Sequence, residues 1–230
     1  GSPELYPQFA VEVLRRYPAN IHVSFVASHI FTHTSVKWGA PGKNAKKFRA
    51  TYLESWKRSA DPLMLLLETC QSDLPARFAI DGLRELFPEV LRKVSPEWLG
   101  RLSLRPLPSA HEFLVETLEG SPEFHQSKLA PLGLKEAVLR LLLSPSPKAR
   151  KYAIEYARAH ATDLSIERIV ALLDQAASFA DTSQFLVSVL IAKPARTLGL
   201  PMLGRLLRFH ASSAWAAAAI ERDFEKKEIS

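Results

Sequence analysis

A helical pattern recurs about every 36 residues along this 230-residue chain. Ala79, Val115, Ala153 and Val187 occupy equivalent places in four short strings, at steps of 36, 38 and 34 residues. The strings also match two repeats apart, because Phe113-Leu114-Val115 reappears as Phe185-Leu186-Val187. A period in this range is typical of stacked helical pairs, which more often bind other molecules than transform them. We therefore predict an all-α fold built from repeated helix pairs.

A second set of helices follows the first. Trp98-Leu99-Gly100-Arg101-Leu102 resembles Met202-Leu203-Gly204-Arg205-Leu206, and the anchors Leu99, Val138, Val170 and Leu203 step by 39, 32 and 33 residues. Each repeat is therefore read as helix A followed by helix B. We predict four antiparallel pairs between about residues 75 and 209, then a terminal helix from Ala214 to Lys226.

Prolines mark the expected helix starts. A capping residue precedes a proline at Asp61-Pro62, Ser95-Pro96, Ser121-Pro122 and Ser146-Pro147. The capping oxygen can accept a free backbone N–H, and proline fits the first helical position. Pro75 and Pro201 are assigned the same role.

These features resemble HEAT-like repeats over roughly residues 75–226. The resemblance rests on the Ala76-Arg77-Phe78-Ala79-Ile80-Asp81 type of A helix, the Val138-Leu139-Arg140-Leu141-Leu142 type of B helix and their spacing. It implies a right-handed α-solenoid whose B helices line a concave surface. Armadillo-type and other α-solenoid repeats are near neighbours, and the residues point to no specific family.

Residues 5–72 fit the period less well, and we expect them to form a helical N-terminal cap or diverged repeats. Helices are predicted at Leu5–Tyr17, Ile21–Val36, Asn44–Ala60 and Pro62–Cys70, with a break at residues 39–42. Residues 1–4, which lack an initiator Met, are interpreted as a vector remnant. The HEAT-like repeats then occupy residues 73–230, as a module of a larger multidomain protein.

Composition favours an intracellular protein. The single cysteine, Cys70, excludes an intrachain disulfide and fits a reducing compartment, and we expect a cytoplasmic location. No apolar run approaches the ~20 residues that a membrane span needs. The formal net charge is +6 and the pI is near 9.5, which permits an acidic partner without requiring one.

The strongest candidate site is the segment Lys37–Arg58. Aromatic residues interleave with its basic residues, as in surfaces that neutralise phosphates and stack bases. Phe48, Tyr52 and Trp56 are also spaced as a helical stripe that can pack in a core, which leaves the cations on a solvated face as the alternative. Its basic residues are Lys37, Lys43, Lys46, Lys47, Arg49, Lys57 and Arg58, against the single acid Glu54.

A second candidate is a row of arginines. Arg101, Arg140 and Arg205 occupy equivalent B-helix positions, and the resemblance would align them on one inner ridge able to grip phosphates or carboxylates. The repeat at Leu172 interrupts the row. The alternative is that these arginines are solvent-exposed charges beside packed leucines.

Neither a metal nor a cofactor is expected. His22, His29 and His33 would share one face of the predicted helix at Ile21–Val36, but His22 lies about 10 Å from His29 on such a helix. No carboxylate completes a metalloprotease-type motif, and no phosphate-binding loop, dinucleotide fingerprint or nucleophile elbow is present. No catalytic residue is assigned.

Three functions remain open. The first is a non-catalytic scaffold that docks a protein partner, with an unknown oligomeric state. The second is a nucleic-acid-binding module that uses the basic segment and the arginine row. The third is a base-excision enzyme, since some HEAT-like folds are DNA glycosylases; Asp81, Trp98 and Arg101 would then be the residues of interest, on fold analogy alone.

Overall fold

The computed structural model describes residues 21–24, 35–38, 53–209 and 212–224. By its internal contacts the chain divides into two units, Gly1–Thr117 and Leu118–Ser230, each of which is described by itself. Every described element from residue 53 onwards is helical, so the predicted helical class holds there.

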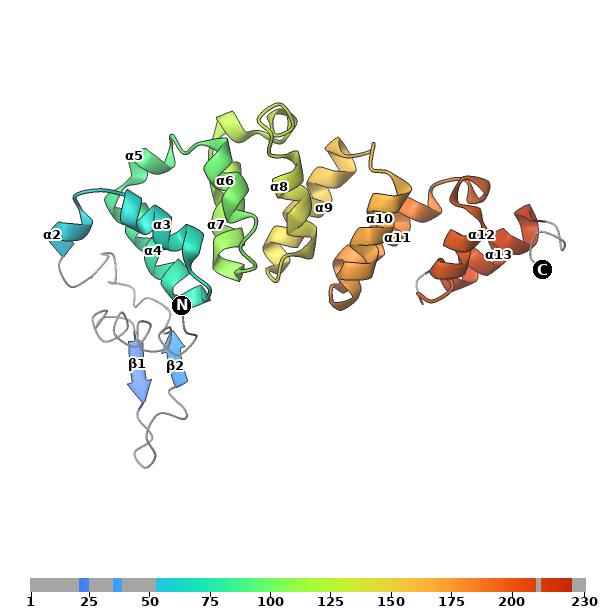
Figure 1. Ribbon diagram of the computed structural model, residues 1–230, viewed down its shortest axis with the longest axis horizontal. Coiled ribbons are helices and arrows are strands. Elements are labelled where there is room, and N and C mark those ends of the chain that lie inside the picture. The colour runs from blue at the N-terminus through green and yellow to red at the C-terminus, as the bar shows by residue number, and fades with distance from the viewer. Residues whose placement is uncertain (1–20, 25–34, 39–52, 210–211, 225–230) are drawn as a thin grey trace. The chain divides into compact units, whose positions relative to one another are not determined.

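The first unit begins with two short strands, which Figure 1 shows as a hairpin. Strands β1 (Ile21–Ser24) and β2 (Ser35–Trp38) pair antiparallel, with Ile21 opposite Trp38 and Ser24 opposite Ser35. The helix predicted over Ile21–Val36 is therefore wrong at both of its ends. The β-branched residues Ile21, Val23 and Val36 favour extended backbone, and they alternate with polar residues at the two-residue repeat of a strand.

The helices of the first unit follow the hairpin. Helix α3 packs directly against α4, and the edge-to-face contact of Trp98 with Phe113 joins α6 to α7. The structure bounds these helices as α2 (Leu53–Trp56), α3 (Asp61–Thr69), α4 (Asp73–Leu86), α5 (Pro88–Leu91), α6 (Pro96–Leu102) and α7 (Pro108–Gly120).

The second unit continues the same alternation. Helix α9 packs on α8 and the short turn η3, α10 on α11 and α12 on α13, as Figure 1 shows. The α-helices are α8 (Lys135–Arg140), α9 (Pro147–His160), α10 (Ile166–Gln175), α11 (Ala180–Ile191), α12 (Ala195–Leu206) and α13 (Ser213–Asp223). The 3₁₀ turns are η1 (Pro122–Phe124), η2 (Gln126–Lys128), η3 (Leu141–Leu143) and η4 (Ala176–Ser178).

The contacts pair the predicted B helices α6, α8 and α10 with the predicted A helices that follow them, α7, α9 and α11, so the predicted order of A then B within a pair is reversed. The predicted A helix α4 pairs with α3, and the predicted B helix α12 pairs with the terminal helix α13. We call α3, α6, α8, α10 and α12 the first helices, and α4, α7, α9, α11 and α13 the second helices. Successive helices of one kind also meet within a unit, since α3 contacts α6 and α9 contacts α11.

The periodic positions form the core. All eight predicted anchors are buried, and none has more than 5% of its surface exposed. They are Ala79, Val115, Ala153 and Val187 on second helices and Leu99, Val138, Val170 and Leu203 on first helices. Burying apolar side chains at the repeat spacing holds the pairs together.

The predicted helix starts are largely confirmed. Ser95 accepts the backbone N–H of Trp98 at 3.2 Å, Ser146 that of Ala149 at 3.4 Å and Ser121 that of Glu123 at 3.3 Å. The start at Asp61 differs, because Asp61 lies inside α3 and its own N–H is bound by the hydroxyl of Ser59 at 3.1 Å.

Helix α12 contains a kink at Gly199. This residue has a φ of +73°, in the left-handed region that favours glycine, and Pro201 lies two residues later, in the first turn of the helical stretch that follows. Proline has no backbone N–H, and the kink would leave that N–H without a helical acceptor at this position. Proline therefore loses no helical hydrogen bond here.

Candidate functional site

The structure describes part of the predicted basic segment. Lys37 lies in β2, and Lys57 and Arg58 follow α2 in an exposed turn. Lys57 donates to the carboxylate of Glu54 at 2.7 Å, an exposed i, i+3 pair. Such a pair contributes little to stability, so Lys57 can exchange Glu54 for another anion. The remaining predicted residues, Lys43, Lys46, Lys47 and Arg49, lie outside the described residues.

The aromatic stripe of this segment has one described member. Trp56 packs edge-to-face on Phe78 of α4, with ring centroids 5.4 Å apart. Phe78 is buried, so this contact attaches the end of the basic segment to the first helix pair. Phe48 and Tyr52 lie outside the described residues.

The basic segment carries the whole charge imbalance of the chain. It has seven basic residues and one acidic residue, an excess equal to the formal net charge of +6. Positive and negative charges therefore balance over the rest of the sequence. Any electrostatic attraction of the chain for anions is therefore concentrated between residues 37 and 58.

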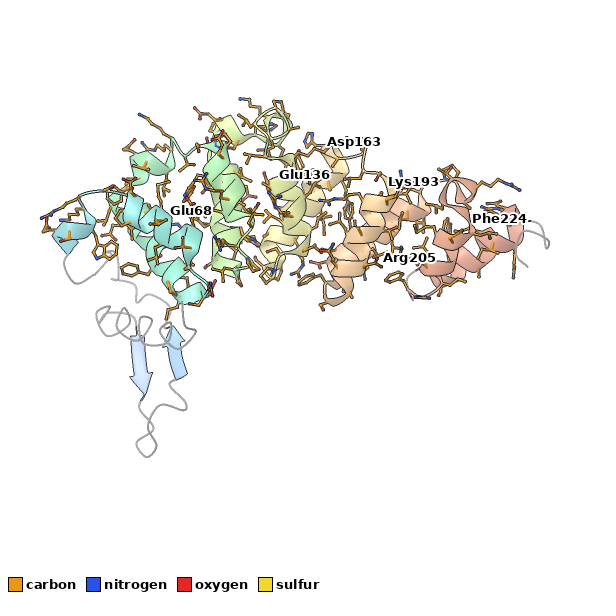
Figure 2. The ribbon with its side chains drawn as sticks, in the orientation of Figure 1. Glu68, Glu136, Asp163, Lys193, Arg205 and Phe224 are labelled. Atoms are coloured by element: carbon orange, nitrogen blue, oxygen red, sulfur yellow. The ribbon has the colours of Figure 1, made fainter. Side chains whose placement is uncertain are left out.

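The predicted arginine row takes part in ion pairs. Arg101 donates to both carboxylate oxygens of Glu68, from Nε at 2.9 Å and from Nη2 at 3.1 Å. This hydrogen bonding raises the pKa of Arg101. Arg205 pairs with Asp174, and Arg140 is half-buried at the end of α8. Figure 2 labels Glu68 on α3 and Arg205 on α12.

The carboxylates that bind these arginines come from the preceding helix pair. Glu68 and Asp174 precede their arginines by 33 and 31 residues, and Glu136 precedes Arg168 by 32 residues, at 3.0 Å. Sequence reasoning missed Arg168 and all three acids. A sequence signal for these ion pairs was available, because an acidic residue lies 31 to 33 residues before each of these arginines.

Ion pairs also connect neighbouring second helices. Arg84 of α4 pairs with Glu116 of α7, and Arg150 of α9 pairs with Asp181 of α11 at 2.8 Å. Most of these surface pairs are solvated and contribute at most about 1 kcal/mol each. Arg150 differs, because only 11% of its side chain is exposed.

The residues of interest for base excision are Asp81, Trp98 and Arg101. Trp98 is 2% exposed and packs against Phe113, so its ring cannot stack on a base in this conformation. Arg101 is engaged by Glu68. Asp81 is half-buried on α4, and burial raises the pKa of its carboxyl group. Trp98, the one aromatic residue of the three, therefore offers no open ring face.

The other chemically active side chains have structural surroundings. Cys70 is buried, and desolvation raises the pKa of its thiol to about 11, so the reactive thiolate is scarce at neutral pH. His22 lies in a strand, so the helix face that it was predicted to share with His29 and His33 does not extend to it. His29 and His33 lie outside the described residues. Within the described ranges, no three His, Cys, Asp or Glu side chains gather as a metal site.

Comparisons with protein-family models, curated proteins and solved structures found no match for this chain. In the part of the chain that the structure describes, none of the helices has the length and apolar character needed to cross a membrane.

Proposed function

We propose that this chain is a non-catalytic helical-repeat module that docks a protein partner. In this proposal the helix pairs stack as a right-handed α-solenoid of the HEAT-like type, and the module acts as an intracellular scaffold within a larger protein. The observation that supports the proposal is the burial of all eight periodic anchors, whose spacing along the sequence is that of the proposed repeat.

The polar side chains support the same assignment. The charged groups that could have formed a catalytic cluster, Arg101 among them, instead link one helix pair to the next. Repeats joined in this way present long rows of exposed helix surface, which suit binding of an extended partner.

Cross-linking tests the scaffold proposal. The purified chain is incubated with extract of its source cells and cross-linked, and partners are identified by mass spectrometry. We expect one recurrent protein, cross-linked to exposed residues of the helix pairs, and its loss from a heat-unfolded sample of the same chain. Recovery of no partner, together with full activity of the parent protein after this module is deleted, would falsify the proposal.

Nucleic-acid binding is the second candidate, favoured by the concentration of net charge in the basic segment. Mobility-shift titration should show binding that weakens steeply with salt. Glutamine substitutions at Lys57 and Arg58 should weaken it, whereas substitutions at Arg101 and Arg205 should change it little, because those arginines lie outside the segment that carries the net positive charge. Absence of a shift at micromolar protein and low salt removes this candidate.

A further inference from the structure

Two arginines lie over phenylalanine rings at matching places in the two units. The guanidinium carbon of Arg84 is 5.6 Å from the ring centroid of Phe113, and that of Arg158 is 5.5 Å from Phe185. Each contact joins one second helix to the next, α4 to α7 and α9 to α11. Phe113 and Phe185 begin the two Phe-Leu-Val strings, so the internal repeat makes the two sites comparable.

The two sites differ at the position three residues after the phenylalanine. In the first unit Arg84 also pairs with Glu116, three residues after Phe113. The residue three positions after Phe185 is Ser188, whose hydroxyl donates to the carbonyl of Phe185 at 2.6 Å. No carboxylate of the described residues forms an ion pair with Arg158.

The surroundings of Arg158 favour an anion. Lys151 is exposed on the same face of α9, about 10 Å away over two helical turns. Glu155 is the one acid on the exposed face of α9, and Asp181 of α11 is held by Arg150 at 2.8 Å. Contact with Phe185 restricts the guanidinium in advance, so less side-chain entropy is lost on binding.

We infer that the face formed by α9 and α11 binds an acidic segment of the protein partner, with a carboxylate occupying at Arg158 the place that Glu116 occupies at Arg84. The inference rests on the proposed scaffold function and adds the chemistry of the partner. A carboxylate is chosen over a phosphate because the internal counterpart of the site holds a carboxylate.

The test supplies the missing carboxylate from within the chain. Binding of a fluorescein-labelled peptide of alternating Glu and Ala is measured by anisotropy at low salt. Ser188→Glu should weaken binding about tenfold by filling the site at Arg158, and Arg158→Gln should weaken it to a similar degree. Ser188→Gln, which adds no charge, should change the affinity less than about twofold.

Gln175→Glu is the matched charge control. It adds the same negative charge to an exposed position of α10, a first helix, and should also change the affinity less than about twofold. Circular dichroism checks that each variant is folded.

Two outcomes would overturn the inference. One is equal weakening by Ser188→Glu and Gln175→Glu, or no binding of the peptide by the original chain. The other is tighter binding of labelled duplex DNA or RNA that Ser188→Glu abolishes, which would assign the site to phosphates. If cross-linking still recovers a partner through other faces, the scaffold function stands while this inference fails.

Discussion

Arg150 makes several contacts in the second unit, and its removal gives a quantitative test of how the helix pairs are joined. Its Nε donates to both oxygens of Asp181 at 2.9 and 2.8 Å, and Nη1 donates to the carbonyl of Ser144 at 2.8 Å. The guanidinium also lies 4.7 Å from the ring centroid of Phe179. One side chain thus joins the loop before α9 to the start of α11.

Arg150→Met should destabilise the protein by about 3 kcal/mol. A buried acceptor left without its donor costs about 1–3 kcal/mol, and Ser144 is fully buried. The contact with Phe179 adds about 0.5–1 kcal/mol. The Asp181 pair adds less than a buried pair would, because 40% of the Asp181 side chain is exposed. Methionine retains part of the aliphatic packing.

Urea unfolding followed by circular dichroism measures this change, and hydrogen exchange shows whether the loss lies in α9 and α11. Lys151→Met is the matched control, since it also replaces a cationic side chain with methionine, at the next residue, which is exposed; we expect less than about 0.5 kcal/mol there. A loss below about 1 kcal/mol for Arg150→Met, or one equal to the control, would refute the reasoning.

Three further predictions concern buried or strained positions. Burial lowers the pKa of His111 to about 4 from 6.5, so the free energy of unfolding should fall by about 2 kcal/mol as the pH drops from above 6.5 to about 5. Urea unfolding of His111→Gln should lack this loss. The same dependence of stability on pH in the variant would contradict the prediction. Thr182→Val removes a buried hydroxyl that donates to the carbonyl of Leu142 at 2.7 Å, and should cost about 1–2 kcal/mol in the same assay; a neutral result would indicate that the carbonyl finds another donor. Gly199→Ala should cost about 1 kcal/mol in thermal unfolding because of its positive φ, whereas Gly204→Ala, with open space around its Cβ position, should be neutral or stabilising; effects of the same sign would contradict the assigned kink.

The sequence predicted the helical core well because the signal is local and repeated. Apolar positions such as Ala79 and Leu99 recur at one period, and both are buried. Serine before proline identified three helix starts by the same local chemistry. The helix predicted at Ile21–Val36 failed because apolar residues spaced by two were interpreted at a spacing of three to four.

The candidate site was harder to predict because pairing across repeats depends on three-dimensional neighbours. Arg101 and Arg205 each lie in the last turn of a helix, α6 and α12, but their partners lie 33 and 31 residues earlier in the sequence. An arginine and an acid at that distance look unrelated unless the repeat length is applied to charges as well as to apolar residues. The basic segment remains a prediction, since most of its side chains lie outside the described residues.

Helix α10 carries one partner for each of its neighbours. Arg168 near its start binds Glu136 of α8, and Asp174 near its end binds Arg205 of α12. Helix α10 thus has a cation that binds the helix pair before it and an anion that binds the helix pair after it, so its two ends carry opposite charges. In the proposed array, deleting the pair of α10 and α11 would bring Glu136 of α8 next to Arg205 of α12, and duplicating that pair would bring Asp174 of one copy next to Arg168 of the other. The proposed array could therefore change in length at this helix pair without leaving mismatched charges.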